Sequence, residues 1–353
     1  METDRKKIKI ICVIGTRPQF IKHAAIEHCD HLGIEFITVH TSQHYDENMS
    51  DVFFDQLSIH TPKYQLSNVH KTNPKEHNEY MFWELNEIFQ KELPTGVMVY
   101  GDTDTTLAGA KAAHHLGLPV IHVEAGLRSY NEAMQEEINR VQTDKISTLL
   151  LVPNEAAQLN LKKEGIEGSG VVIVGDVMKD VIALRPSFTK NAAEDYHYAT
   201  LHRPYNVDNK ERLMSILDAL NTLDQQIILS IHPRTQSRMD SFGLFPAKYA
   251  NITFIGPQSY FENIRLMDES TSLITDSGGM QKEAYWLQKP CITLRPETEW
   301  RETLQNECNV LVYEDLERIP ELLKRSFGPF DPELYGDGSA AQKIIASIYN
   351  RFQ

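Results

Sequence analysis

Three carboxylates in the first half of the chain have the residue type and position that proton transfer needs. Asp102 follows the apolar run GVMVYG and Glu124 follows the apolar run PVIHV, while Glu136 lies in the segment MQEEINR. Burial at a strand end raises a carboxyl pKa toward neutrality, where the group can act as a general acid or base. Position alone suits a structural carboxylate equally well. The neighbouring Glu137 is expected on a solvated helix face.

Two loops have the composition of phosphate-binding turns. Residues 15–18 (GTRP) follow the first apolar run, and residues 277–279 (SGG) follow the run SLITD; each loop opens an expected helix. N–H groups at a helix N-terminus attract anions, Arg17 adds positive charge, and adjacent glycines let the backbone approach a ligand. Glu283 comes a turn or more later, within reach of a ribose hydroxyl. Taken singly, each loop is equally consistent with an ordinary strand-to-helix turn.

Other common catalytic motifs are absent from the sequence. His202 and His232 each end an expected strand, where a lone histidine is more often structural than catalytic. There is no Walker loop, no G-x-S-x-G elbow and no G-x-G-x-x-G, so nothing supports a dinucleotide cofactor. The four cysteines lack metal-type spacing, and Cys12 and Cys291 lie in runs that predict buried strands, so we expect neither zinc nor disulfides.

Length and composition narrow the class of protein. At 353 residues the chain exceeds the usual size of one hydrophobic core, which predicts two domains and a cleft between them. The net charge of -14 disfavours nucleic acid as a partner, and no apolar run approaches the roughly 18 residues of a membrane span. The N-terminal stretch leads directly into GTRP without a cleavage site, which predicts a first strand in a cytoplasmic protein rather than a signal peptide.

Short β-branched runs alternate with amphipathic stretches along the chain. This alternation predicts an α/β protein in which helices cover both faces of parallel sheets, with ligands at the carboxyl ends of the strands. Polar residues around Pro186 predict a linker and hinge within residues 176–195. The expected strands lie in the runs KIKIICVIG, IEFITVHT, GVMVYG, PVIHVEAG, TLLLVP, VVIVG, YHYATLH, QIILSIHP, ITFIG, SLITDSGG, PCITLR and NVLVY.

Taken together, the loops resemble one enzyme family in order and spacing. The signatures are GTRPQFIK, TSQHYDENM, VYGDTDTT, HVEAGLRS, EEINR, TLHRPYN, TDSGGMQKEA, RPETEWRE and YGDG, and they extend from residue 8 nearly to the end. They are similar to those of the non-hydrolysing UDP-N-acetylglucosamine 2-epimerases. GTRPQ, GDVM and TEWRE resemble especially the subgroup that acts on UDP-2,3-diacetamido-2,3-dideoxy-glucuronate.

The resemblance implies an architecture, an activity and partners. It implies a GT-B-like fold of two Rossmann-like domains facing a central cleft, at residues 1–178 and 179–335, with a helix at 336–353 that packs back on the first domain. The implied activity inverts C2 of a UDP-linked acetamido sugar without a cofactor or a metal, in polysaccharide biosynthesis. A cytoplasmic homodimer is expected on the same ground.

The resemblance also implies a role for each candidate residue. The catalytic residues would be Asp102, Glu124, Glu136 and His202. Diphosphate contacts would come from Arg17, Ser277, Gly278 and Gly279, the ribose contact from Glu283, uracil contacts from Gln258, Tyr260 and Phe261, and further polar groups near the sugar from Lys22, His44 and Arg140.

Some segments depart from the family pattern. Residues 66–82 replace a glycine-rich loop that shapes the sugar pocket and part of a regulatory site in bacterial relatives. Gln135 stands where a proline is common, and Arg301 stands where an aliphatic residue is frequent, so Arg301 is a candidate partner for a substrate carboxylate or for a surface salt bridge. A hydrolysing 2-epimerase, a GT-B glycosyltransferase and a non-catalytic sugar-nucleotide sensor are the alternative functions.

Overall fold

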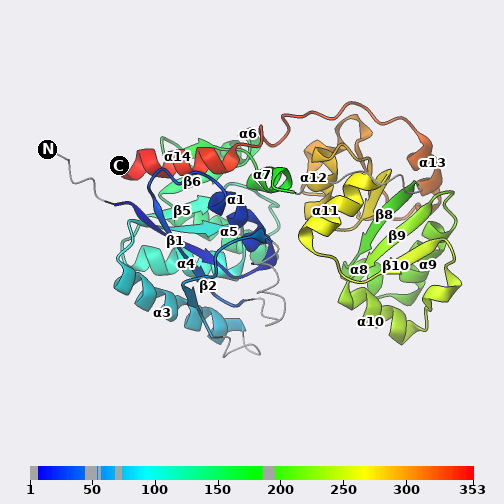
Figure 1. Ribbon diagram of the computed structural model, residues 1–353, viewed down its shortest axis with the longest axis horizontal. Coiled ribbons are helices and arrows are strands. Elements are labelled where there is room, and N and C mark those ends of the chain that lie inside the picture. The colour runs from blue at the N-terminus through cyan, green and yellow to red at the C-terminus, as the bar shows by residue number, and fades with distance from the viewer. Residues whose placement is uncertain (1–6, 44–53, 55–56, 68–73, 186–194) are drawn as a thin grey trace. The chain divides into compact units, whose positions relative to one another are not determined.

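The structure is a computed structural model that describes residues 7–43, 54, 57–67, 74–185 and 195–353. His44 and Pro186 lie outside the described residues. The chain divides into two compact units, one formed by residues 1–184 together with 335–353, the other by residues 185–334. Each unit is described by itself below, with the element labels of Figure 1.

The first unit is built on a seven-stranded parallel sheet. Its strand order is β3-β2-β1-β4-β5-β6-β7, so the order reverses between β1 and β4. Such a reversal leaves a crevice at the carboxyl ends of the two strands, where ligands of open α/β sheets bind. The strands are β1 (Lys9–Ile14), β2 (Glu35–His40), β3 (Tyr64–Gln65), β4 (Gly96–Tyr100), β5 (Val120–Val123), β6 (Leu149–Val152) and β7 (Val171–Ile173).

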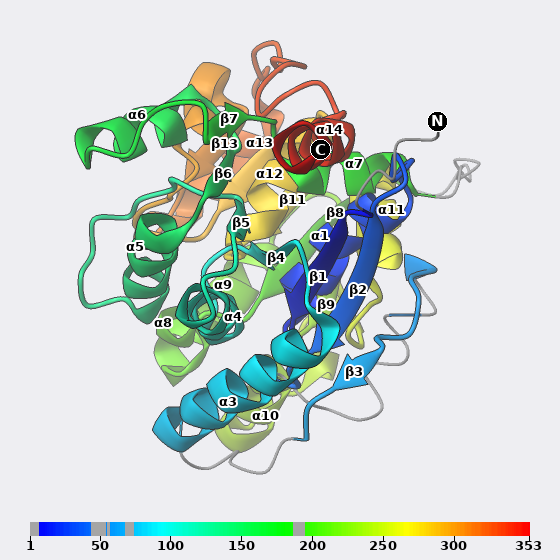
Figure 2. The same ribbon diagram turned by 90° about the vertical axis from the view of Figure 1, so that its left-hand side faces the viewer.

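Helices cover both faces of this sheet. Helix α14 packs against α1 and α7, whereas α4 packs against both α3 and α5. Figures 1 and 2 show α14 and α3 on opposite sides of the strands. Ile11 and Val13 of β1 share a core with Met81 and Leu85 of α3, because alternate residues of a strand point to the same face. The helices are α1 (Arg17–Glu27), α3 (Pro74–Glu92), α4 (Asp104–His115), α5 (Gln135–Ile146), α6 (Glu155–Lys163), α7 (Val177–Ala183) and α14 (Ala340–Phe352).

The second unit contains a six-stranded parallel sheet. Its order is β10-β9-β8-β11-β12-β13, which reverses between β8 and β11. The strands are β8 (Tyr196–Leu201), β9 (Gln226–Ile231), β10 (Ile252–Ile255), β11 (Ser272–Thr275), β12 (Cys291–Thr293) and β13 (Asn309–Leu311). The helices are α8 (Pro204–Val207), α9 (Lys210–Asn221), α10 (Pro233–Phe242), α11 (Tyr260–Glu269), α12 (Gly278–Trp286) and α13 (Ile319–Lys324), with short 3-10 turns η1 (Pro246–Lys248), η2 (Arg301–Glu307) and η3 (Leu316–Arg318).

The predicted fold class is confirmed, and two details differ from the prediction. All twelve expected strands form, and Cys12 and Cys291 are buried in β1 and β12. Strand β3 was missed because two residues are too few to show a periodic pattern. Part of the expected linker was assigned wrongly: residues 177–183 form helix α7, whose side chains Val181 and Ile182 are buried.

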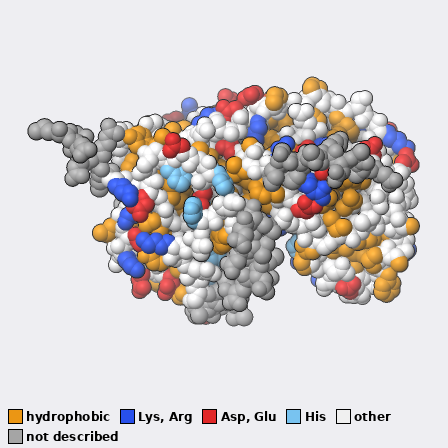
Figure 3. Space-filling view, in the orientation of Figure 1, with side chains coloured by type: hydrophobic (Ala, Val, Ile, Leu, Met, Phe, Trp, Pro, Cys, Tyr) orange, Lys and Arg blue, Asp and Glu red, His pale blue; other side chains and the backbone are white. Residues whose placement is uncertain are grey.

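The visible surface carries both signs of charge. Figure 3 shows described Lys and Arg side chains lying among Asp and Glu on this face of the molecule rather than in one continuous basic area. None of the described helices is both long enough and apolar enough to cross a membrane.

Candidate active site

Several of the predicted site residues follow strands at or next to the reversals of the two sheets. In the first unit, Arg17 follows β1, Asp102 follows β4 and Glu124 follows β5. In the second unit, His202 follows β8 and Ser277 follows β11. The carboxyl ends of neighbouring parallel strands meet at the same edge of a sheet, so each set of loops lies together.

Asp102 is held by a cation from a neighbouring helix. Its carboxylate accepts a hydrogen bond from Arg140, which lies on α5 and also donates to Glu137 at 3.0 Å. Burial raises the pKa of Asp102, and the charges of Arg140 and Lys22 oppose this rise without cancelling it. Glu124 raises the pKa of Asp102 further. A carboxyl with a raised pKa next to a cation is suited to exchange a proton.

Glu124 forms an ion pair with Lys22. The Nζ of Lys22 lies 2.5 Å from Oε2 of Glu124, and both side chains are largely buried. Glu124 adopts a left-handed backbone conformation with φ of +67°, which costs free energy for a residue other than glycine. Gly126 follows with φ of +78°, and a Cβ there would lie 2.5 Å from the carbonyl oxygen of Ala157. The loop after β5 therefore requires glycine at position 126 to present Glu124.

The two neighbouring glutamates of α5 have different environments, and the environment predicted for Glu137 was wrong. Glu137, predicted to be solvated, is buried and accepts hydrogen bonds from the N–H and hydroxyl of Ser129 and the N–H of Tyr130. Burial raises the pKa of Glu137, but these hydrogen bonds and Arg140 lower it below its ordinary value. Glu136 lies in the first turn of the helix and is exposed, with its charge near enough to raise the pKa of Asp102.

Gln19 joins the loops after β1 and β4. Its Oε1 accepts from the N–H groups of Gly15 at 2.8 Å and Thr16 at 3.2 Å, while its Nε2 donates to the carbonyl of Tyr100 at 3.0 Å. Gly15 is required here by space, since a Cβ would lie 2.0 Å from the hydroxyl of Thr41. Arg17, at the start of α1, is exposed.

A buried network that sequence reasoning missed lies under the same loops. The ring of His122 contacts the carbonyl of Gly101 and the carboxylate of Asp144, each at 2.7 Å. The other oxygen of Asp144 lies 2.7 Å from Nη1 of Arg128. All three side chains are almost entirely buried. A histidine within the strand that precedes Glu124, two positions before it, was the available sequence signal.

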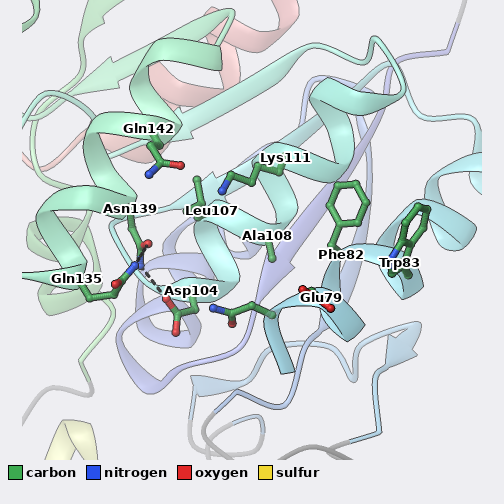
Figure 4. A pocket seen from close by; sticks show the side chains of 11 residues that line it. Glu79, Phe82, Trp83, Asp104, Leu107, Ala108, Lys111, Gln135, Asn139 and Gln142 are labelled. Atoms are coloured by element: carbon green, nitrogen blue, oxygen red, sulfur yellow. Dashed lines mark hydrogen bonds between the residues drawn. The ribbon is translucent and has the colours of Figure 1, made fainter. Parts of the chain in front are cut away.

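A pocket between α3, α4 and α5 adjoins this region. It encloses about 350 Å³, and Figure 4 shows Phe82, Trp83 and Glu79 on one side and Asn139, Gln135 and Gln142 on the other. Asn139 links the pocket to the predicted site, because its amide donates to the carbonyl of Asp102 and to the carboxylate of Asp104, both at 3.0 Å.

In the second unit, His202 is paired with a buried carboxylate. Its Nδ1 lies 3.0 Å from Oδ1 of Asp276, and the same carboxylate accepts from the N–H groups of His202 and Arg203 and from the amide of Asn206. Burial raises the pKa of Asp276, but the contacts with His202, Arg203 and Asn206 lower it below its ordinary value. Asp276 was not predicted as a site residue, although it directly follows an apolar strand.

The glycine-rich loop caps helix α12. Ser277 is its N-cap, and Gly278 and Gly279 are its first two residues. The N–H of Ser277, predicted to face a ligand, donates instead to the hydroxyl of Thr275 at 3.0 Å. Glu283 is buried further along the helix. The backbone at Gly278 and Gly279 therefore offers the anion-binding geometry of a helix N-terminus.

An arginine and a glutamate missed by the sequence analysis lie beside this helix start. Arg295 pairs with Glu299 at 2.9 Å, and a Cβ at Gly278 would lie 2.5 Å from Oε1 of Glu299. The carboxylate thus occupies space next to the first helical residue, and a side chain at position 278 would displace it.

The predicted uracil-binding stretch spans the start of α11. Gln258 donates to the carbonyl of Gly256 at 2.7 Å, and Ser259 caps the helix. Tyr260 is buried, and its ring centroid lies 5.5 Å from that of the half-buried Phe261. The first unit thus brings together Asp102, Glu124 and Glu136 with Lys22 and Arg140, and the second brings together His202 with the start of α12.

Fold and site define an α/β protein of GT-B-like fold, with two Rossmann-like units and partly buried carboxylates that directly follow strands. Residues 27–349 match the profile of the UDP-N-acetylglucosamine 2-epimerase family. The chain belongs to this family.

Individual relatives match over nearly their whole length. A UDP-N-acetylglucosamine 2-epimerase homolog of Methanococcus maripaludis is 42% identical, over 97% of this chain and 100% of that protein. The UDP-2,3-diacetamido-2,3-dideoxy-D-glucuronate 2-epimerase of Pseudomonas aeruginosa is also 42% identical, over 96% and 98%. The crystal structure of Methanocaldococcus jannaschii UDP-GlcNAc 2-epimerase in complex with UDP-GlcNAc and UDP superposes with a TM-score of 0.84 at 38% identity, covering 97% of this chain and 100% of that one.

Proposed function

We propose that this protein inverts C2 of a UDP-linked acetamido sugar by eliminating UDP and adding it back to a glycal intermediate. The observation that carries the proposal is the pair of carboxylates Asp102 and Glu124, each matched with a cation, at one edge of the first sheet. Membership of the 2-epimerase family supports the same reaction.

The chemistry explains why two carboxylates are needed. The C2 proton of the sugar is not acidic, but it becomes so as the C1–O bond breaks and positive charge develops at C1. One carboxylate then takes the C2 proton while the electron pair of the C1–O bond leaves with UDP. Return of a proton to the opposite face of C2 and re-addition of UDP complete the inversion. The raised pKa of Asp102 suits it to proton transfer, and Glu124 is the second group.

The remaining predicted residues have consistent roles. The charge of Glu136 raises the pKa of Asp102. Lys22 holds Glu124 in place, and Arg140 holds Asp102 in place. His202, oriented by Asp276, and the start of α12 at Gly278 and Gly279 stabilise the leaving diphosphate, together with Arg17 and Ser277. Glu283 is assigned to the ribose, the residues Gln258, Tyr260 and Phe261 to uracil, and His44 to the sugar.

The test is proton NMR of the purified protein with UDP-GlcNAc and, separately, with UDP-2,3-diacetamido-2,3-dideoxy-glucuronate in D2O. Epimerised UDP-sugar carrying deuterium at C2 is expected, because the proton held by the carboxylate exchanges with water. Stoichiometric free sugar and UDP would instead identify a hydrolysing enzyme. Full retention of the C2 proton during inversion would exclude the elimination route.

We further propose that the protein acts as a cytoplasmic homodimer and that the exposed faces of α3 and α4 form the interface. Trp83 is 61% exposed, and its ring centroid lies 5.0 Å from that of Phe82, which in turn lies 5.6 Å from His115. An exposed aromatic cluster of this kind favours association. Sedimentation should show that Trp83→Glu converts dimer to monomer, whereas Phe245→Glu, at a similarly exposed aromatic of the second unit, leaves the dimer intact.

A further inference from the structure

His122 connects two of the loops that carry the proposed acid–base groups. It lies in the middle of β5 and is fully buried. Its Nε2 lies 2.7 Å from the carbonyl oxygen of Gly101, the residue before Asp102, and its Nδ1 lies 2.7 Å from Oδ1 of Asp144. The ring therefore ties the loop after β4 to helix α5.

Asp144 extends this connection to the loop after β5. Its Oδ2 accepts from the N–H of Gly126 at 3.2 Å and from Nη1 of Arg128 at 2.7 Å. Gly126 comes two residues after Glu124, and Asp144 lies on the same helix as Arg140, the partner of Asp102. The pair of His122 and Asp144 thus joins the three segments that present Asp102, Glu124 and Arg140.

Both ring nitrogens of His122 have an oxygen as partner, one from a backbone carbonyl and one from a carboxylate. The Gly101 carbonyl can only accept a hydrogen bond, so Nε2 of His122 donates to it. Burial raises the pKa of Asp144, but contacts with His122 and Arg128 lower it below its ordinary value. Contacts at both nitrogens hold the ring in one orientation between the two segments.

We propose that the His122–Asp144 pair is a positioning pair that fixes the separation of Asp102 and Glu124 for proton removal and proton return. The proposal rests on the proposed elimination mechanism. Glu124 needs such support because its left-handed backbone is costly by itself. Neither His122 nor Asp144 is assigned to substrate, since both are fully buried.

Loss of the pair has a specific chemical consequence. Elimination requires one carboxylate to take the C2 proton while UDP leaves with the bonding electron pair. Completion requires the second carboxylate, correctly placed, to return a proton to the other face. If the two loops shift apart, re-addition is slowed more than elimination, and the glycal and UDP escape in equal amounts while the abstracted proton passes to water. A residue that only stabilised the fold would not change the ratio of released glycal plus UDP to epimer.

The experiment compares His122→Gln and Asp144→Asn with Lys145→Gln, a control at an exposed residue next to Asp144 on α5. Displacement of reacting groups by about 1 Å costs roughly 10²-fold in rate, so we expect about a 10²-fold lower kcat for the two test variants, with KM changed by less than about threefold. Proton and phosphorus NMR should show a ratio of released glycal plus UDP to epimer at least about fivefold above wild type. The control should match wild type in all three quantities.

Two results would overturn the positioning role. One is a folded His122→Gln variant with wild-type kcat and a wild-type ratio of released glycal plus UDP to epimer. The other is a folded Asp144→Asn variant with wild-type kcat and a wild-type ratio of released glycal plus UDP to epimer. If instead the wild-type protein epimerises none of the tested UDP-sugars and exchanges no C2 proton, the proposed function itself is wrong.

Discussion

Asp102 and Asp276 occupy equivalent places in the two units, yet their environments have opposite effects. Each follows a strand beside the point where its sheet reverses. Burial raises the pKa of both, but Asp276 accepts hydrogen bonds from His202, Arg203 and Asn206 and ends with a lowered pKa. Asp102 has Arg140 as its cationic partner and ends with a raised pKa.

This difference is the one expected between a group that is proposed to exchange protons and a group that holds another residue. Several N–H donors fix a carboxylate in its ionised form, whereas burial with nearby carboxylates keeps it near the protonated form. The first unit therefore has the features of the proton-transfer region, and the second has those of an anion-binding region in which Asp276 orients His202. The predictions below test this division, beginning with the largest effect.

Replacement of the proposed acid–base groups should have the largest effect on turnover. Asp102→Asn or Glu124→Gln should lower kcat by roughly 10²- to 10⁴-fold, the usual contribution of general acid–base catalysis. Binding of UDP, measured by calorimetry, should stay at the wild-type level because both side chains are assigned to the sugar and not to the diphosphate. Wild-type turnover in both variants would contradict the assignment of proton transfer to the first unit.

Diphosphate contacts should affect binding rather than proton transfer. Arg17→Ala and Ser277→Ala remove groups proposed to contact the diphosphate, and loss of a charge-assisted hydrogen bond costs about 1.5–3 kcal/mol, or roughly 10- to 150-fold in affinity. Calorimetry with UDP measures this loss. Arg351→Ala, at an exposed arginine of α14, is the control and should bind UDP as wild type does. Unchanged affinity in both test variants would place Arg17 and Ser277 outside the site.

Replacing each of the two aspartates should have a different effect on the free energy of unfolding. Asp276→Asn leaves buried N–H donors poorly matched and should lower the free energy of unfolding by roughly 1–3 kcal/mol. Asp102→Asn removes a charge that burial disfavours and should not lower it at neutral pH. Denaturant melts measure both changes. Equal destabilisation by the two substitutions would contradict the comparison.

The pH dependence of stability follows from the same shifts. A lowered pKa means that folded Asp276 binds fewer protons than the unfolded chain, so its contribution is present above its ordinary pKa and lost as pH falls. Wild type should therefore lose more stability between about pH 5 and pH 2 than Asp276→Asn does. For Asp102 the sign is reversed: its raised pKa favours folding at low pH, and this contribution is lost as pH rises.

The smallest predicted effect concerns substrate choice. Arg301 is exposed at the start of η2. If it contacts a C6 carboxylate, Arg301→Ala should lower kcat/KM for the uronate substrate about 10-fold or more, while leaving the value for UDP-GlcNAc nearly unchanged. An equal effect on both substrates would assign Arg301 a structural role.

The sequence by itself determined the class of fold and the positions of the main loops. Alternation of apolar runs with amphipathic stretches is local, so β1 and α1 could be read directly, as could the placement of Asp102 and Glu124 after strands. The collinear signatures identified the family because they occur in the same order over almost the whole chain.

Tertiary structure alone decided how each charge is used. Glu136 and Glu137 are adjacent in sequence, yet only Glu137 is buried, because Ser129 and Tyr130 from another loop supply its donors. His122 likewise depends on Asp144, 22 residues away in sequence. Local patterns specify which segments form strands and helices. The pKa and orientation of a side chain depend on donors and charges from segments distant in sequence, which come together only when the sheets and helices pack.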